Sequence, residues 1–338
     1  MTGPDLTRAA SAVDLAGTVV RSAIEALAAH GNVDVDQVLA YDIAHAAAAV
    51  ETARALLDYG TLGDIEAAIT CAFVADAVHD LAGKILGRES QWGVETDVLA
   101  PVHDVVRDFR SPQFLSSITE EGPRHLDDDF ELVQDAFRRF ADEKIRPEAE
   151  HIHRSNGDIP EELISGLAEM GGFGLSVPEE YGGFAAGGES DYLGMVVATE
   201  ELSRGSLGAG GSLITRPEIL TRALVKGGTE EQKQYWLPRL ATAEEMAAVA
   251  VTEPDFGSDV AGIKVTATPT EDGTGWVING VKTWCTFGAR ATVLMLLART
   301  DPDRTKAHRG LSLFVVPKPI GDGHGFEFGG ERGGKMEG

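Results

Sequence analysis

The stretch Val-Ala-Val-Thr-Glu-Pro-Asp-Phe-Gly-Ser at residues 249–258 carries most of the information about the fold. Its first residues are apolar and mostly β-branched, which is typical of a buried strand. Pro254 and Gly257 then predict a turn that exposes main-chain amides together with the hydroxyls of Thr252 and Ser258. Such groups can hold a pyrophosphate or bind the polar edge of a heteroaromatic ring. Taken alone, the stretch also fits an ordinary acidic turn.

The sequence around this stretch changes in character near residue 245. From there on, short runs rich in apolar and β-branched residues predict strands, and Asn279-Gly280 between two of these runs predicts a hairpin. Residues 245–338 are therefore expected to form a β domain. The chain stops in a glycine-rich tail without a closing element, so we expect this domain to be incomplete and Gly338 not to be the natural terminus.

Before residue 245 the sequence is predominantly helical. Residues 1–115 are expected to form a helical bundle that precedes the other domains. Apolar residues recur there at fours or multiples of four, as in Ile69, Phe73, Leu81 and Ile85. A polar passage follows, and residues 125–244 form a second helical region, in which the run Asp127–Asp129 is placed to cap a helix. The expected fold class is α+β, with the helices first and the sheet after them.

Composition excludes several classes of protein. The chain has 338 residues, and 29 basic against 54 acidic side chains give a formal net charge of −25, which argues against a general nucleic-acid or anionic-membrane binder. Two cysteines, Cys71 and Cys285, cannot form a disulfide framework or a four-thiolate zinc site. The sequence contains no HExxH or CxxC motif that would predict a metal site. We expect a cytoplasmic protein that neither inserts into membranes nor binds nucleic acid.

Several stretches, in a fixed order, make this sequence resemble the acyl-CoA dehydrogenase family. The matching stretches are Phe173–Gly183, Glu200–Arg204, Gly228–Lys233, Leu237–Pro238, Val251–Pro254, Gly257–Asp259, Ile278–Lys282 and Leu311–Pro317. The resemblance covers residues 125–338. It implies an FAD-dependent enzyme with a helical N-terminal domain and a middle β domain, followed by a C-terminal helical domain that is absent here. It also implies that electrons pass to an electron-transferring flavoprotein and that the protein is a homodimer or homotetramer.

The resemblance assigns candidate cofactor-binding residues to two stretches. They are Val249, Val251, Thr252, Gly257, Ser258, Trp284, Cys285 and Thr286. By this resemblance Thr252 hydrogen-bonds the pyrimidine side of the flavin, and Ser258 contacts the pyrophosphate and the substrate. Trp284 flanks the ring and Thr286 lies near its N5 atom, which receives hydride. This sequence departs from many members at Phe287, which occupies a position in the same loop.

The resemblance also implies the reaction, the α,β-dehydrogenation of an acyl-CoA. In most members the catalytic glutamate lies in the C-terminal domain, so the base is expected beyond Gly338 and no residue here is assigned to it. The sequence is most similar to members whose short branched substrate carries a free carboxylate. Arg216 is the candidate partner for that carboxylate. A dehydrogenase of another acyl-CoA, a flavin oxidase or monooxygenase, and a non-catalytic acyl-CoA-binding or assembly protein remain as alternatives.

Overall fold

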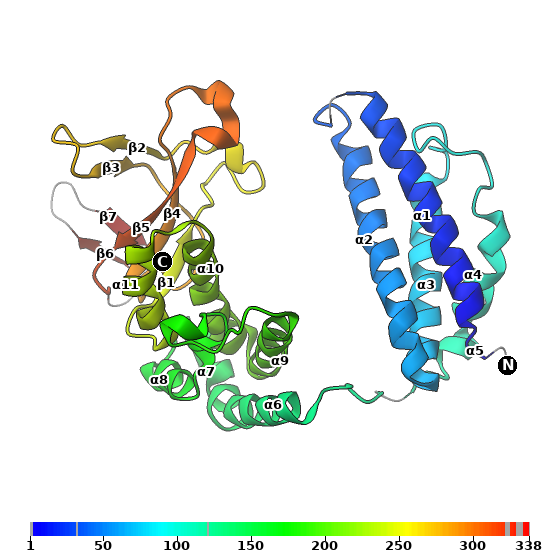
Figure 1. Ribbon diagram of the computed structural model, residues 1–338, viewed down its shortest axis with the longest axis horizontal. Coiled ribbons are helices and arrows are strands. Elements are labelled where there is room, and N and C mark those ends of the chain that lie inside the picture. The colour runs from blue at the N-terminus through cyan, green and yellow to red at the C-terminus, as the bar shows by residue number, and fades with distance from the viewer. Residues whose placement is uncertain (1–2, 32, 120–121, 322–324, 329–333, 338) are drawn as a thin grey trace. The chain divides into compact units, whose positions relative to one another are not determined.

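The computed structural model describes residues 3–31, 33–119, 122–321, 325–328 and 334–337. These residues form two compact units, one at each end of the chain, which meet in sequence between His125 and Leu126 (Figure 1). The expectation that Gly338 is not the natural terminus concerns a residue that lies outside the described part of the chain. In the described part of the chain, no helix is long and apolar enough to cross a membrane.

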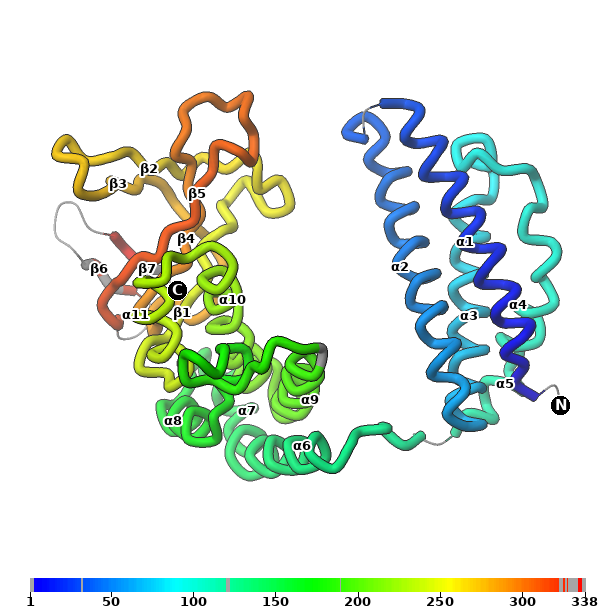
Figure 2. The backbone as a smooth tube through the Cα atoms, in the orientation of Figure 1, coloured from blue at the N-terminus to red at the C-terminus, as the bar shows by residue number. Residues whose placement is uncertain are grey.

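The first unit is a bundle built on three long helices, α1 (Leu6–Ala29), α2 (Gln37–Tyr59) and α3 (Asp64–Ile85). They lie side by side along their length, and a single turn, η1 (Gly60–Leu62), joins the last two (Figures 1 and 2). Their inner faces carry mostly small or β-branched side chains, including Ala9, Ala12, Val13, Ala16, Val19, Ala23, Ile43, Ala46, Val50, Val74, Ala75 and Val78. Small side chains let the helix axes approach closely, which explains the high alanine content of this region.

Shorter elements complete the bundle. These are η2 (Ala100–Val102), α4 (His103–Phe109) and α5 (Pro112–Leu115). Trp92, which precedes them, and Phe109 of α4 are fully buried and are the bulkiest fully buried side chains in the described part of this unit. The first unit therefore has a hydrophobic core of its own.

Polar contacts of Arg8 and of His125 join distant parts of the first unit. Arg8 donates to Asp104 at 2.5 Å and to Asp108 at 2.8 Å, which ties α1 to α4. Near the end of the unit, His125 Nε2 lies 2.8 Å from the buried Glu66 carboxylate. The hydrogen bond to His125 lowers the pKa of Glu66 below its usual range. This contact holds the last residues of the unit against the start of α3.

The second unit begins with a layer of helices. In chain order they are α6 (Asp128–Phe140), the π-helix η3 (Ala141–Ile145), α7 (Arg146–Ser155), α8 (Glu161–Glu169), α9 (Glu189–Gly205), the π-helix η6 (Leu207–Gly211), α10 (Ser212–Gly227) and α11 (Glu230–Ala241). The short 3-10 turns η4 (Gly172–Gly174) and η5 (Glu179–Tyr181) lie between α8 and α9. Asp127 accepts a hydrogen bond from the Phe130 amide at 2.9 Å, so the predicted acidic cap of α6 is confirmed.

A mixed sheet follows the helices, as predicted from the change of composition near residue 245. Its strands are β1 (Ala247–Ala250), β2 (Thr266–Pro269), β3 (Trp276–Asn279), β4 (Val293–Arg299) and β5 (Leu311–Pro317). The order is β1-β4-β2-β3, with β1 parallel to β4 and β5 antiparallel to it. A separate antiparallel pair consists of β6 (Gly325–Phe328) and β7 (Gly334–Glu337). The α+β expectation is confirmed, with an extra bundle before it.

The two faces of the sheet have different neighbours. Ala247 and Val249 of β1 pack in a core with α10 and α11, whereas Ala248 and Ala250 face a second core that includes Val265. Neighbouring strand residues point to opposite faces, so β1 contributes to both cores. In β4, which is the centre of the sheet, the run Val293–Arg299 is almost continuously buried. The 3-10 turns η7 (Val260–Gly262) and η8 (Arg304–Gly310) connect the strands.

The hairpin predicted at Asn279-Gly280 is wrong. Strand β3 ends at Asn279, and its antiparallel partner is the preceding strand β2. The turn of this hairpin is at 270–275, where the Thr270 hydroxyl lies 2.6 Å from Asp272 and accepts from Gly275 N at 3.0 Å. Gly280 is required for a reason other than a turn. Its φ is 139°, and a Cβ there would clash with the side chain and the main chain of Val265.

Gly183 offers a test of how tightly the segment after η4 packs. A Cβ at this position would overlap the carbonyl group of Val177, whose side chain is fully buried. Because a main-chain atom cannot move aside as a flexible side chain does, we expect Gly183→Ala to lower the free energy of unfolding by about 1–3 kcal/mol. Chemical denaturation followed by circular dichroism measures this. Gly208 has open space around it and is the control position. The neighbouring Gly182 is unsuitable as a control, because its φ of 84° would strain any other residue. Gly208→Ala should leave stability almost unchanged, and equal losses in both variants would contradict the packing argument.

Candidate functional site

The candidate site lies where strand β1 (Ala247–Ala250) ends. The chain turns back after Thr252, and Glu253 and Phe256 exchange main-chain hydrogen bonds of 2.9 and 3.2 Å. Gly257 and Ser258 follow on the exposed side of this turn, and a Cβ at Gly257 would meet open space. The predicted turn is therefore present, with its small residues exposed.

The second predicted stretch lies directly beside the first. Thr283 N donates to Thr252 O at 2.8 Å. Lys282 Nζ donates to Val251 O at 2.8 Å and to Glu253 Oε1 at 2.9 Å. Residues about 30 positions apart in the chain thus form one surface, which carries Thr252 on one side and the residues after Thr283 on the other.

The ion pair between Lys282 and Glu253 lies in the interior, with side chains 7% and 4% exposed. The Glu253 carboxylate also accepts from Lys264 N at 2.7 Å and from Val265 N at 2.9 Å. Burial opposes ionisation of Glu253, but the two main-chain donors and the Lys282 ammonium outweigh it and lower the pKa of Glu253. Burial also lowers the pKa of Lys282. This pair joins three segments of the site.

Trp284 projects from this surface. Its side chain is 88% exposed, and its φ of 60° lies in the left-handed region, as does the φ of 61° at Phe287. Left-handed backbone is unfavourable for large residues, so two such residues in four indicate a loop held by its surroundings. An exposed indole on such a loop is available to contact a flat ring.

The two stretches that the Thr283–Thr252 hydrogen bond joins also carry hydroxyl groups without a partner in the described part of the chain. The buried hydroxyl of Thr283 makes no hydrogen bond within the described structure. The hydroxyls of Thr252, Ser258 and Thr286 also form none among the described residues. The two stretches thus offer an exposed indole together with these free hydroxyl groups. This combination fits a flavin, whose ring system is flat and whose pyrimidine edge and phosphates accept and donate hydrogen bonds.

Three of the predicted cofactor residues use their side chains for packing. Val249 and Val251 lie against the core shared with α10 and α11. Cys285 packs against the core on the other face of the sheet, and burial raises the pKa of its thiol. Their place in the site therefore rests on the main chain. In the described part of the chain, no three side chains of histidine, cysteine, aspartate or glutamate gather as metal ligands.

Comparison with known families agrees with this geometry. Residues 127–244 match the description "Acyl-CoA dehydrogenase, N-terminal domain", and residues 248–336 match "Acyl-CoA dehydrogenase, middle domain". The chain belongs to the acyl-CoA dehydrogenase family. The first match corresponds to the helical layer of the second unit and the second match to its strands, including both stretches of the candidate site.

Individual relatives show the same family. The chain is 46% identical over 217 residues to (2S)-methylsuccinyl-CoA dehydrogenase of Cereibacter sphaeroides, covering 64% of this chain and 38% of that protein. It is 37% identical over 216 residues to mitochondrial isovaleryl-CoA dehydrogenase of Solanum tuberosum, covering 63% of this chain and 49% of that protein. The chain thus spans half or less of the length of these curated relatives.

Two solved structures share the fold of this chain, and the first of them holds a reduced flavin cofactor. A glutaryl-CoA dehydrogenase of Mycobacterium smegmatis in complex with FADH2 is 30% identical, with a TM-score of 0.51 and coverage of 63% of this chain and 52% of that one. A second, a glutaryl-coenzyme A dehydrogenase in complex with glutaryl-CoA, is 30% identical with a TM-score of 0.54, covering 64% and 55%. FAD is accordingly the cofactor of the acyl-CoA dehydrogenases to which this chain is similar.

Arg216 lies apart from the two loop stretches, on helix α10. It is half-buried, and its Nε is fully buried without a hydrogen-bond partner among the described residues. Leu213 and Ile214, just before it, share a hydrophobic core with Phe287, which belongs to the loop of residues 284–291, here called the Trp284 loop. Because a partly buried guanidinium without a carboxylate partner is unfavourable, this side chain is suited to an anionic ligand.

A second arginine of α10 is already paired. Arg222 donates to Glu218 at 2.6 Å, and its guanidinium lies 4.5 Å from the centre of the Tyr192 ring. These residues line a groove of about 420 Å³ between α9 and α10, with Met195, Val196, Thr199, Glu200 and Ser203. Arg222 therefore already has a carboxylate partner, which Arg216 lacks among the described residues.

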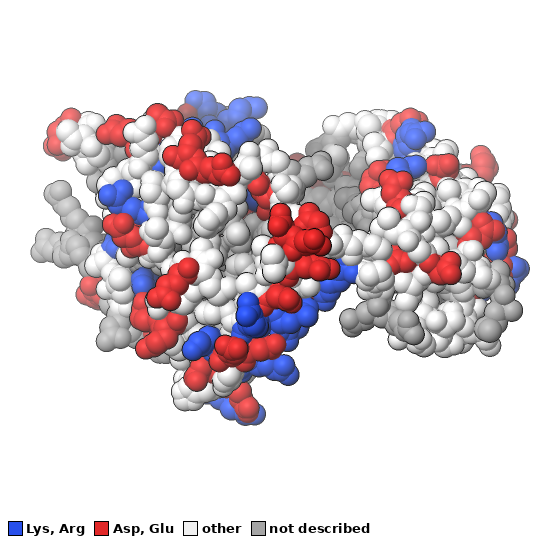
Figure 3. All heavy atoms as spheres, turned by 60° about the horizontal axis from the view of Figure 1, so that its bottom comes forward, with Lys and Arg blue, Asp and Glu red and all other residues white. Residues whose placement is uncertain are grey.

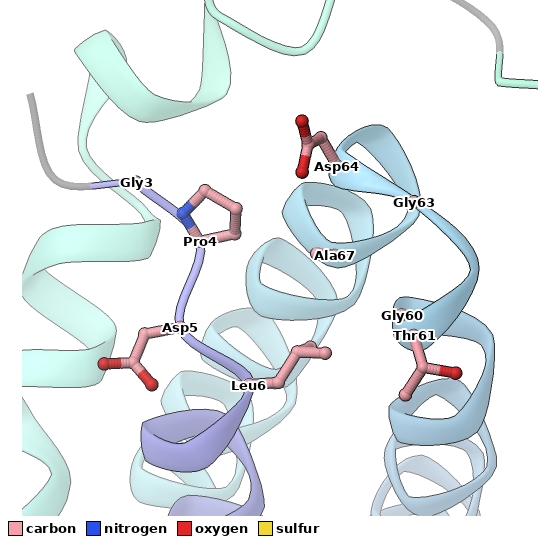
Figure 4. A pocket seen from close by; sticks show the side chains of 9 residues that line it. All are labelled: Gly3, Pro4, Asp5, Leu6, Gly60, Thr61, Gly63, Asp64 and Ala67. Atoms are coloured by element: carbon pink, nitrogen blue, oxygen red, sulfur yellow. The ribbon is translucent and has the colours of Figure 1, made fainter.

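The first unit contains a larger open pocket of about 780 Å³, shown in Figure 4. It is lined by Gly3, Pro4, Asp5, Leu6, Gly60, Thr61, Gly63, Asp64 and Ala67. Its two charged lining side chains, Asp5 and Asp64, are acidic and would repel the phosphates of FAD or of an acyl-CoA. The pocket also lies outside the residues that match the acyl-CoA dehydrogenase family. We therefore place the functional site in the second unit.

Sequence reasoning did not assign the buried pair of Lys282 and Glu253 a part in building the site. The signal available in the sequence was a lysine and a glutamate, each within a run of otherwise apolar or small residues. Charged residues are rarely fully buried unless they are paired. The partner of each, however, is set by the tertiary fold.

Proposed function

We propose that this chain supplies the flavin-binding part of an FAD-dependent dehydrogenase that oxidises a short branched acyl-CoA, converting (2S)-methylsuccinyl-CoA to mesaconyl-CoA in the ethylmalonyl-CoA pathway. The observation that carries the substrate choice is Arg216, a half-buried arginine whose Nε has no partner among the described residues. The 46% identity to (2S)-methylsuccinyl-CoA dehydrogenase supports the same substrate. The candidate cofactor surface supports the redox chemistry.

The proposed roles of the site residues follow from their positions. Trp284 would cover one part of the flavin ring, since its indole is exposed on a constrained loop. Thr252 and Thr286 would hydrogen-bond the polar edge of the ring, and Ser258 the phosphates or the substrate. When bound, FAD accepts the two electrons of the oxidation as a hydride. The pair of Lys282 and Glu253 would keep the two stretches at a fixed separation.

Arg216 would bind the free carboxylate of the substrate. Acidic side chains are spread over the visible faces of both units (Figure 3), and the net charge of −25 opposes the approach of an anionic ligand. A local cation must therefore select the carboxylate. An arginine does this well because its planar guanidinium can donate two parallel hydrogen bonds to one carboxylate.

The remaining parts of the proposal concern the whole protein. The base that removes the α-proton is not assigned to a residue of this chain. An electron-transferring flavoprotein is the proposed electron acceptor, and a cytoplasmic homodimer or homotetramer is the proposed assembly. These proposals rest on the family resemblance.

Flavin absorbance under anaerobic conditions tests the function. The full-length protein is purified and titrated with methylsuccinyl-CoA and, in parallel, with butyryl-CoA, which lacks the carboxylate. We expect bleaching of the flavin with methylsuccinyl-CoA and much less with butyryl-CoA. Bleaching by other acyl-CoAs alone would contradict the substrate, and an absence of bound flavin would contradict the dehydrogenase and favour an acyl-CoA-binding protein. Reoxidation by air without an added acceptor would favour an oxidase.

Replacement of Arg216 tests the substrate carboxylate. We expect Arg216→Ala to weaken binding of methylsuccinyl-CoA by about tenfold to a hundredfold, because a charge-assisted hydrogen bond contributes ~1.5–3 kcal/mol. Binding of butyryl-CoA should hardly change. Arg222→Ala on the same helix is the matched control, since that guanidinium is already paired with Glu218. If both variants, or neither, change the preference between the two ligands, Arg216 does not bind the carboxylate.

A further inference from the structure

A buried lysine outside the Trp284 loop forms hydrogen bonds with the main chain of that loop. Lys318 follows the last strand residue of β5 (Leu311–Pro317) and is only 7% exposed. Its ammonium donates to the carbonyl oxygens of Ala289 at 3.0 Å and Pro319 at 2.7 Å, and also to that of Ala291. An ammonium group has three N–H donors, so it can donate to all three carbonyl oxygens at once.

Two of these carbonyls belong to the turn that follows Trp284. Ala291 N donates to Phe287 O at 2.8 Å, which closes the turn immediately after the left-handed Phe287. The main chain near Lys318 holds the same turn, because Gly321 N donates to Ala289 O at 3.0 Å. The turn is thus fixed from the side of β5.

An ion pair fixes the other side of the turn. Arg290 donates to both carboxylate oxygens of Glu161 on α8, with one of the two distances at 2.9 Å. Besides burial, Arg290 is also the charged group whose proximity acts on the pKa of Lys318. The ion pair ties the turn to the helical layer, while Lys318 ties it to the sheet.

We infer that Lys318 is a positioning residue for the Trp284 loop, whose ammonium holds the carbonyls of Ala289 and Ala291 so that the indole projects toward the flavin. The left-handed conformations of Trp284 and Phe287 require such support, because unfavourable backbone persists only where its surroundings determine it. The inference rests on the proposed function for the flavin, but it concerns the order of Trp284 whether or not a flavin is bound.

The protonation state of Lys318 provides a measurable signature. Burial, together with the positive charge of Arg290, lowers the pKa of Lys318 to about 8. Above that pH the neutral amine has two donors and a lone pair for three carbonyl oxygens, and one contact becomes repulsive. Arg290 and Glu161 keep their charges in this range, because their ion pair raises the pKa of Arg290 and lowers that of Glu161. The loop should therefore loosen as the pH rises through about 8.

The experiment measures the order of Trp284 without flavin and then the affinity for FAD. The fluorescence anisotropy of the full chain is compared with that of its Trp284→Phe counterpart, so that the difference isolates this tryptophan. Lys318→Met has nearly the same length and shape but no donors. Lys306→Met is the matched control, because Lys306 is exposed and pairs with Asp301 away from the loop.

We expect Lys318→Met to lower the anisotropy of Trp284 and to weaken FAD binding about tenfold, while Lys306→Met changes neither. Wild-type protein should show the same loss of anisotropy with a midpoint near pH 8, and Lys318→Met should show no such transition. Unchanged anisotropy in folded Lys318→Met, or a flat wild-type profile, would overturn the inference. If Lys318→Met does not fold, the wild-type profile decides. If wild-type protein binds no FAD, the proposed function fails, and the anisotropy still tests Lys318.

Discussion

Lys282→Met is expected to lower the free energy of unfolding of the second unit by about 3–5 kcal/mol. The substitution preserves length and apolar contacts but removes the ammonium that pairs with Glu253, whose side chain is 4% exposed. A buried carboxylate without its cation is far less favourable than the intact pair. Denaturation with urea, followed by circular dichroism, measures the loss.

Two controls separate the buried pair from a general effect of charge. Lys264→Met removes an exposed lysine whose ammonium is 3.2 Å from Asp255, and it should change stability by less than about 1 kcal/mol. Glu253→Gln combined with Lys282→Met should recover part of the loss, because no charge is then buried. If Lys264→Met and Lys282→Met are equally harmful, burial of the pair does not determine its contribution.

The same pair predicts a pH dependence. The pKa of Glu253 is lowered in the folded protein, so its contribution to stability is complete above the ordinary carboxyl range and is lost as the pH falls through the folded pKa. In Lys282→Met the carboxylate can take up a proton as the pH falls, which removes the unpaired charge. The difference in stability between wild type and Lys282→Met should therefore be largest near neutral pH and shrink toward pH 4. A difference that is constant between pH 4 and 7 would contradict this.

Trp284→Gly is expected to weaken FAD binding by about 30-fold to 150-fold while leaving the apoprotein almost as stable as wild type. Loss of the indole removes an apolar contact of roughly 2–3 kcal/mol with a bound flavin. In the apoprotein the side chain is 88% exposed, so little packing is lost. Relief of the left-handed backbone, ~1–2 kcal/mol, offsets the added chain entropy of glycine, ~0.5–1 kcal/mol. Flavin titration and urea denaturation measure the two effects separately.

Trp276→Ala is the matched control for Trp284. Trp276 is 47% exposed on β3, and its ring packs edge-on against Phe314 at a centroid distance of 5.5 Å. Its removal should reduce stability and leave FAD affinity unchanged. If Trp284 contacts the flavin, only Trp284→Gly should weaken FAD binding and only Trp276→Ala should reduce stability. Equal effects of the two variants on FAD binding would contradict a contact between Trp284 and the flavin.

Local chemistry explains which features the sequence predicted well. The cap at Asp127 depends on residues within one helical turn, and the change to strands near residue 245 depends on composition within short windows. The Asn279-Gly280 prediction failed because the glycine is required by a long-range contact with Val265 rather than by a turn. A local signal cannot distinguish these two causes.

The arrangement of the candidate site could be predicted only in part. The chemistry of Thr252 and Trp284 was visible in the sequence, and the family resemblance brought the two stretches together. The partners Glu253 and Lys282 are 29 positions apart, and their burial depends on how their two segments meet a third one at 264–265. The left-handed backbone of Trp284 is equally non-local, because nothing in its own sequence favours that conformation.

The parallel pairing of β1 with β4 also has a consequence for the order of folding. Ala247 pairs with Val293, so this ladder joins residues 46 positions apart and cannot form until the intervening chain has left the ribosome. The bundle of α1, α2 and α3 pairs helices that are joined by short turns, and such local contacts form early. During synthesis we therefore expect the bundle to be folded while β1 still lacks its neighbour, which leaves the apolar edge of β1 in need of protection from aggregation at that stage.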